Sequence, residues 1–163
     1  MINYLKFFTW LDQQAINGLQ DALFERPEKR EAQRKLAQEI TRMVHGETAV
    51  GKAEKAASVL FGGELDGLDA GDIRDIFADV PSSTIAKTDL EDGRATLVDL
   101  LVASGLERGK GAARRAIQGG GIYLNNQRVT DVAQTAGISD AIEGQFLVLR
   151  KGRKRYHLVK VEG

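Results

Sequence analysis

Three consecutive glycines at residues 119–121 divide the second half of the chain into a helical part and a strand-like part. Before them, two patterns of helical spacing cover about residues 95–104 and 110–118. After them, strand-like runs cover residues 121–125, 146–150 and 156–161, and hairpin turns are predicted at residues 125–127 and 151–153. The sequence therefore predicts a small α+β module over residues 94–163, with two helices followed by a small antiparallel sheet.

The first 79 residues have helical patterns throughout, and they predict an N-terminal all-α domain. Asp12 is a good N-cap for a helix over residues 13–24. Pro27 suits the first turn of a longer helix that Gly46 ends, because glycine readily adopts the backbone conformation of a C-cap. The apolar faces of these helices are formed by side chains at helical spacing: Leu5, Phe8, Trp10, Ile16, Leu19, Leu23, Ala32, Leu36, Ile40, Met43 and Val44.

Residues 80–93, VPSSTIAKTDLEDG, are polar, contain proline and serine, and follow no clear period. Such a stretch between two patterned regions is typical of a loop. We therefore predict three parts: a helical domain over residues 1–79, a linker over 80–93 and the α+β module over 94–163.

The formal net charge of zero conceals an uneven distribution along the chain. Residues 1–90 hold 11 lysines and arginines against 15 acidic residues, whereas residues 91–163 hold 12 against 8. An excess of positive charge in one part of a chain is a pointer to nucleic acid. A basic surface that is merely solvated is the alternative, and the charge alone leaves it open.

The basic residues gather at the start of the second helix of the module and at the turn between its last two strands. The first turns of a helix have free N–H groups that attract phosphate, and basic side chains there strengthen that attraction. We predict RNA phosphate contacts at Lys110, Arg114, Arg115, Arg128, Lys151, Arg153, Lys154 and Arg155. Tyr123 and Tyr156 are possible base-stacking residues, although aromatic residues on strands more often belong to the core.

No active site is evident in the sequence. Lys110 lacks the following Ser/Thr and the preceding glycine of a phosphate loop, and the three glycines precede a strand instead of opening a helix. The chain has no cysteine, and its two histidines, His45 and His157, lie far apart, so no metal site is predicted. No apolar run approaches the ~20 residues that span a bilayer, and no signal peptide is present, which predicts a cytoplasmic protein.

Residues 95–161 resemble the RNA-binding module named after the fourth protein of the small ribosomal subunit. The resemblance rests on KGAARR at residues 110–115, GIYLNN at 121–126 and LRKGRK at 149–154. The first half extends it. LKFFT at residues 5–9, KREAQRKLAQEITRMVHG at 29–46 and LFGG at 60–63 resemble the anticodon-binding helical region of bacterial-type tyrosyl-tRNA synthetases.

This resemblance to the C-terminal part of a tyrosyl-tRNA synthetase implies a chain that binds tyrosine tRNA. The parent enzyme joins tyrosine to its tRNA with ATP and Mg as a homodimer. Its HIGH-like and KMSKS-like signatures are missing from this sequence, so the chain is expected to lack the catalytic domain, to be inactive alone and to need no cofactor. A monomeric fragment and an organellar origin both remain open.

Two positions depart from the family pattern. The family usually has Ser at the position of Gly109 and Glu or Gln at that of Ala112, and together these side chains form a capping box. Their replacement predicts a weaker N-cap and puts a contact between Gly109 and RNA in doubt. Two other functions remain: a stand-alone, ribosome-associated RNA-binding protein, and an interaction module that does not bind RNA.

Overall fold

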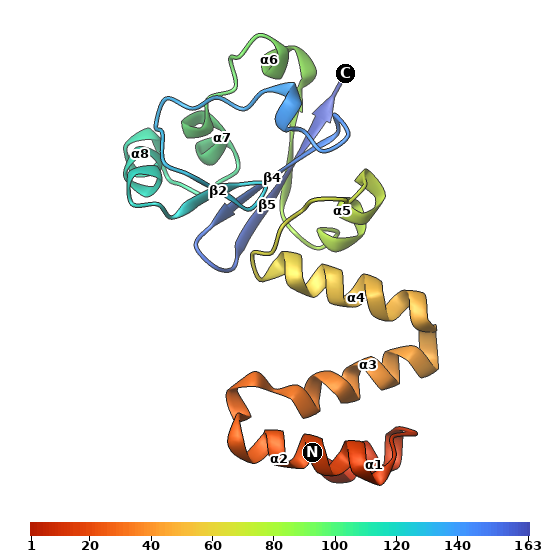
Figure 1. Cartoon of the computed structure of the whole chain (residues 1–163). Coiled ribbons are helices and arrows are strands. Elements are labelled where there is room, and N and C mark those ends of the chain that lie inside the picture. The colour runs from red at the N-terminus through yellow and green to blue at the C-terminus, as the bar shows by residue number, and fades with distance from the viewer. The chain divides into compact units, whose positions relative to one another are not determined.

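The computed structural model describes residues 1–163, which divide into two compact units, Met1–Lys55 and Ala56–Gly163. Helix α4, Glu47–Leu60, crosses the division. Figure 1 shows the helices and strands of each unit, coloured by their position along the chain.

The first unit is built from helices around a small core. Its elements before α4 are α1 (Ile2–Phe8), α2 (Gln13–Glu25), the 3-10 turn η1 (Pro27–Lys29) and α3 (Glu31–His45). The predicted caps are confirmed, since Asp12 Oδ1 accepts a hydrogen bond from the Ala15 N–H at 2.7 Å and Gly46 ends α3 with φ +84°. The predicted continuous helix from Pro27 is wrong, because Arg30 adopts a left-handed conformation with φ 50° and interrupts it.

The core of the first unit is smaller than the predicted apolar faces. Leu5, Ile16 and Ala32 are buried, and Ile2, Leu11, Leu19 and Leu36 pack against them. Five of the predicted apolar residues are exposed instead, with relative exposures between 40% and 92%: Phe8, Trp10, Ile40, Met43 and Val44. The α1 and α2 helices therefore cover only the part of α3 around Ala32 and Leu36.

The second unit contains a five-stranded sheet and four helices after α4. The helices and the second 3-10 turn are α5 (Ala70–Ile76), α6 (Lys87–Glu91), α7 (Leu97–Ala103), α8 (Lys110–Gln118) and η2 (Ile138–Asp140). The strands are β1 (Ser82–Ala86), β2 (Ile122–Leu124), β3 (Gln127–Val129), β4 (Phe146–Lys151) and β5 (Arg155–Glu162). Their order is β1-β5-β4-β2-β3, and only the β1–β5 pair is parallel. The predicted α+β class is confirmed.

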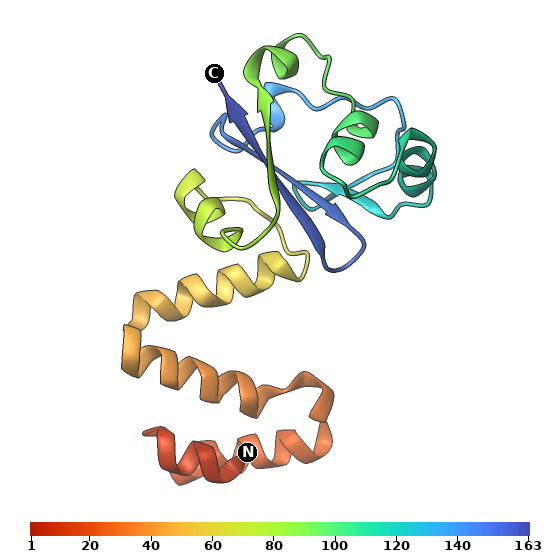
Figure 2. The ribbon, with the colours of Figure 1, turned by 180° about the vertical axis from the view of Figure 1, so that it is seen from behind.

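The sheet has a core on each of its faces. Leu147 and Leu149 of β4 pack on one face with Leu97, Leu101 and Ile117 of α7 and α8. Phe146 and Val148, which alternate with these leucines along β4, pack on the other face with α5 and with Val59 at the end of α4. Figures 1 and 2 show α7 and α8 on one side of the strands and α5 on the other. Successive residues of β4 thus serve opposite faces, and every one from Phe146 to Arg150 is buried.

The predicted linker at residues 80–93 is where the structure differs most from the sequence analysis. Residues Ser82–Ala86 form β1, which pairs with β5 from Ser82 opposite Leu158 to Ala86 opposite Glu162, and α6 follows directly. The segment belongs to the second unit, whose boundary lies at Ala56. The polar composition misled the prediction because β1 is an edge strand, in which Ser83 and Ile85 are the half-buried residues.

The two predicted hairpins are present. Asn125 and Asn126 form the turn between β2 and β3 with φ 49° and 62°, as a tight turn with two left-handed residues requires. Gly152, with φ 62°, lies in the turn between β4 and β5.

No helix is both long enough and apolar enough to cross a membrane.

Candidate nucleic-acid interface

The connection between α7 and α8 lies against the turn of the β4–β5 hairpin. Lys151 Nζ lies 2.7 Å from Glu107 Oε1, and the Arg155 guanidinium donates to the Gly105 carbonyl at 3.5 Å. The Gly152 N–H donates to the Gly121 carbonyl at 2.8 Å, which joins the hairpin to the turn after α8. The structure therefore brings the two basic clusters of the sequence to the same end of the module.

Lys110 is the first residue of α8, and the helix begins without a side-chain cap. Gly109 occupies the N-cap position and has an extended backbone with φ 175°. Lys110 Nζ lies 2.6 Å from Asp99 Oδ1, and Asp99 Oδ2 accepts a hydrogen bond from the Thr96 hydroxyl at 2.7 Å. The hydrogen bond from Lys110 holds the pKa of Asp99 below its usual value. Asp99 thus orients the Lys110 ammonium at the helix start and partly neutralises it.

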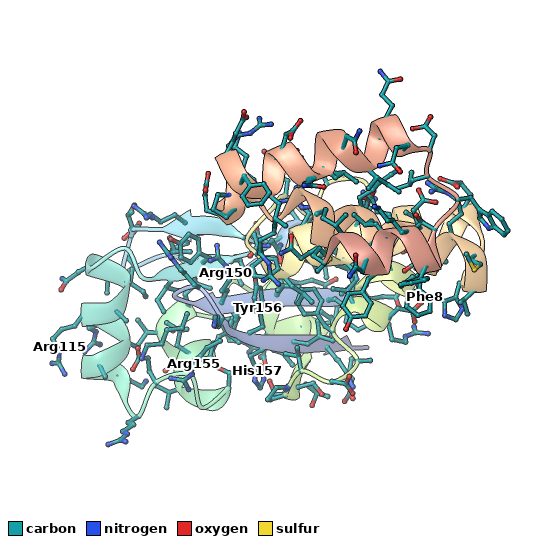
Figure 3. The ribbon with its side chains drawn as sticks, turned by 90° about the horizontal axis from the view of Figure 1, so that it is seen from below. Phe8, Arg115, Arg150, Arg155, Tyr156 and His157 are labelled. Carbon is teal, nitrogen blue, oxygen red and sulfur yellow. The ribbon has the colours of Figure 1, made fainter.

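Arg114 and Arg115 both reach solvent. Neither forms an ion pair, although the Arg114 charge is close enough to contribute to the lowered pKa of Asp99. Both arginines therefore keep their charge exposed at the surface of α8. In Figure 3, Arg115 projects outward from α8.

The side chains of the β4–β5 turn divide into paired and unpaired ones. Arg153 and Lys154 are exposed and have no ion-pair partner, and Arg155 is exposed with its single contact to Gly105. Lys151 differs from them because its partner, Glu107, is buried, with only 8% of that side chain exposed. Arg153, Lys154 and Arg155 are therefore the cations of this turn that have no acidic partner.

Arg128 lies in a row of side chains across four strands, on the face of the sheet opposite to α7 and α8. In this row Arg128 is opposite Tyr123, Tyr123 is opposite Arg150, and Arg150 is opposite Tyr156. The Arg150 guanidinium carbon lies 3.7 Å from the centre of the Tyr123 ring, and that of Arg128 lies 5.7 Å from it. Arg128 also donates to the Tyr123 hydroxyl at 3.2 Å, which lowers the pKa of that phenol. The structure does not bring Arg128 into the basic end formed by α8 and the β4–β5 turn.

The tyrosines of the row differ in accessibility. Tyr123 is half-buried, whereas Tyr156 is buried, packs on Phe77 and donates its hydroxyl to the Val59 carbonyl at 3.0 Å. Burial raises the pKa of Tyr156. Tyr156 is therefore a core residue and cannot stack on a base, while Tyr123 can offer part of its ring.

Two structural roles were missed by the sequence analysis. Arg150 is buried, donating from Nε to Asn126 Oδ1 at 2.7 Å and from Nη1 to the Gly152 carbonyl at 2.8 Å. The Asn126 amide also donates to the Val59 and Gly63 carbonyls at 3.1 Å and 2.8 Å. Figure 3 shows Arg150 beside Tyr156. The Asn125-Asn126 pair indicated a turn, but nothing local indicated that its side chain would hold the end of α4.

Arg108 is a further exposed cation, two residues before Lys110 in the α7–α8 connection. The sequence analysis omitted it because it lies outside both helices, although its position next to the uncapped end of α8 resembles that of Lys110. His157 of β5 is buried, with Nε2 2.9 Å from Ser83 Oγ, and has a structural role.

The chain is similar in sequence to the C-terminal part of known tyrosine–tRNA ligases. Residues 72–159 match the family model of the tyrosine–tRNA ligase SYY-like C-terminal domain. The tyrosine–tRNA ligase of Roseiflexus castenholzii is 50% identical over 97% of this chain and 37% of its own length. The Corynebacterium efficiens ligase is 45% identical over 99% of this chain and 38% of its own length. The Geobacillus stearothermophilus ligase is 42% identical over 98% of this chain and 37% of its own length.

A solved tyrosyl-tRNA synthetase C-terminal domain is 38% identical, covers 61% of this chain and 96% of its own, and superposes with a TM-score of 0.48. The matches in sequence define the C-terminal region of an aminoacyl-tRNA ligase. The chain belongs to the tyrosine–tRNA ligase family. It spans about 37% of the length of the curated relatives that it matches.

Proposed function

We propose that this chain binds tyrosine tRNA as the C-terminal part of a tyrosine–tRNA ligase. The observation that carries the proposal is the Lys151–Glu107 ion pair at 2.7 Å, which holds the start of α8 and the β4–β5 turn beside each other. Seven cations at this end are the proposed phosphate contacts: Lys110, Arg114, Arg115, Lys151, Arg153, Lys154 and Arg155. Arg128 is a further proposed contact, outside this end, on the face of the sheet opposite to α7 and α8.

Phosphate contacts at this end would come from two sources. The uncapped first turn of α8 supplies N–H groups and the positive end of the helix dipole. The exposed arginines and lysines supply charge that releases counterions from the RNA. Such contacts provide affinity and register, whereas discrimination among bases requires stacking or contacts to base edges.

The activity of the whole enzyme is part of the proposal. A tyrosine–tRNA ligase joins tyrosine to its tRNA with ATP, and the relatives extend well beyond the region that this chain matches. In this proposal the chain supplies tRNA binding, and the remainder of the enzyme supplies the chemistry. A homodimeric enzyme that acts in the cytoplasm is what the resemblance implies.

The proposed function is tested by titrating fluorescently labelled tyrosine tRNA with the chain at several salt concentrations. The double substitution Lys110→Ala/Arg153→Ala is expected to weaken binding and to flatten the salt dependence by about two phosphate contacts. Lys160→Ala is the matched control, because Lys160 is an exposed lysine of β5 outside the basic end. Unchanged affinity and salt slope in the double variant would overturn the assignment of this surface.

A further inference from the structure

A groove of about 510 Å³ opens beside the basic end of the second unit. One wall is the start of β5 with Lys154 and Arg155, and a second is the α7–α8 connection from Ser104 to Leu106. The third wall is formed by Asp79, Val80 and Pro81, just before β1. The groove therefore lies next to cations that are proposed to bind phosphate, but the proposed phosphate contacts place no part of the RNA inside it.

The lining of the groove combines three kinds of chemistry. Val80, Pro81, Leu106 and Leu60 provide apolar surface. Lys154 and Arg155 contribute exposed cations to the lining, and Asp79 contributes an exposed carboxylate. A lining that combines apolar surface, two cations and a carboxylate is complementary to a planar, amino-bearing ring that is attached to a phosphate.

The walls of the groove are held by contacts within the second unit. Arg155 reaches the Gly105 carbonyl at 3.5 Å, and the adjacent Glu107 is paired with Lys151 at 2.7 Å. His157, a largely buried residue of the lining, contacts Ser83 at 2.9 Å and thereby ties β5 to β1. These contacts fix the α7–α8 connection and the start of β1 against β5, so the groove is formed before any ligand binds.

We propose that this groove receives one unpaired nucleotide of the bound RNA, a proposal that rests on the proposed function. The volume falls within the range of roughly 300–1,000 Å³ that small-molecule sites occupy, and a duplex cannot enter a hollow of that size. RNA recognition commonly takes unstacked bases onto flat surfaces while cations hold the backbone. Lys154 and Arg155 bind the phosphate, the base lies on Val80 and Pro81, and Asp79 accepts from an amino group of the base.

Two fluorescein-labelled RNA hairpins with the same stem test the proposal, one fully paired and one with a single-nucleotide bulge. The full chain is expected to bind the bulged hairpin about tenfold more tightly, as loss of one stacked base typically costs that much or more. Asp79→Trp fills the groove and is expected to abolish this preference. Asp75→Trp is the matched control, because Asp75 is an exposed aspartate of α5 that does not line the groove.

A second variant, Lys154→Ala/Arg155→Ala, leaves the groove open and is expected to reduce the preference for the bulge, whereas Lys160→Ala retains it. Thermal unfolding of each variant verifies that it is folded. Equal affinity of the unaltered chain for the two hairpins, or a preference that survives in Asp79→Trp, overturns the groove assignment and leaves tRNA binding intact. Failure of both hairpins and of tyrosine tRNA to bind overturns the proposed function as well.

Discussion

The guanidinium carbon of Arg150 lies 3.7 Å from the centre of the Tyr123 ring, and Arg150 is buried without forming an ion pair. Its charge is compensated by the ring face, by Asn126 Oδ1 at 2.7 Å and by the Gly152 carbonyl at 2.8 Å. A cation over an aromatic face gains most when water is excluded. Arg150 therefore connects the β2–β3 turn to the β4–β5 turn from within the sheet.

Arg150→Ala is expected to lower the free energy of unfolding by about 2–4 kcal/mol, because it removes the stacked cation and its hydrogen bonds to Asn126 Oδ1 and to the Gly152 carbonyl. Urea unfolding followed by circular dichroism measures the change. Arg115→Ala, at an exposed position of α8, should stay within about 0.5 kcal/mol of the unaltered chain. Equal losses in the two variants would show that Arg150 has no structural role beyond that of a surface arginine.

Asn126→Gly tests whether the β2–β3 turn holds the end of α4. Glycine accepts the left-handed φ of 62° without strain. The change therefore removes the hydrogen bonds of the side chain to Val59, Gly63, Arg150 and Tyr156 without adding backbone strain. We expect a loss of about 1–3 kcal/mol and faster hydrogen exchange near Gly62. Asn126→Asp keeps the acceptor for Arg150 and should lose less, and the opposite order would contradict this account.

The elements that local chemistry determines were predictable from the sequence. The start of α8, the Asn125-Asn126 turn and the cap at Asp12 each depend on neighbouring residues, and each lies where it was predicted. The β1 strand was not predictable, because its only partner is β5, more than seventy residues later, and an edge strand needs few apolar residues. The compact units likewise divide at Ala56, within a helix that has no composition break.

The candidate site divides in the same way. Clusters of basic residues are visible in the sequence, but their acidic partners are not. Lys110 meets Asp99 across the α7–α8 connection, and Lys151 meets Glu107 from a strand more than forty residues away. These pairs arise from packing, so the sequence could identify the cations without separating those that are free from those that are held.

Lys151 and Lys154 are expected to differ although both belong to the same turn. Lys151→Ala leaves the buried Glu107 carboxylate without a partner and should cost about 1–2 kcal/mol of unfolding free energy, less than a fully buried pair because Lys151 is partly exposed. Lys154→Ala should leave stability unchanged and weaken tRNA binding. Thermal unfolding and tRNA titration of both variants measure the two effects, and a loss of stability in Lys154→Ala alone would refute the distinction.

The weak cap of α8 can be strengthened at Gly109. Its extended φ of 175° suits any residue and a Cβ there meets no atom within 4 Å, so Gly109→Ser is expected to stabilise the chain by about 0.5–1 kcal/mol through a cap and a less flexible unfolded state. Gly152→Ser is the matched control. Its site is equally open but has φ 62°, so serine there should destabilise. Thermal unfolding gives both signs, and stabilisation by both substitutions would rule out the backbone explanation.

His157 should make the second unit sensitive to mild acid. Burial lowers its pKa below the ordinary value of 6.5, so between that value and the folded pKa the unfolded chain binds more protons than the folded chain. The contribution of neutral His157 to the free energy of unfolding is therefore fully present above pH 6.5. It decreases as the pH falls, by at most about 1.4 kcal/mol per pH unit. His157→Gln can still contact Ser83 but does not titrate. Its free energy of unfolding in urea should therefore change less between pH 7.5 and 5.5, a range that lies above the ordinary carboxyl pKa values of roughly 4. His45 is present in both proteins and cancels in the comparison. Parallel pH profiles would exclude His157 as the source of any acid sensitivity.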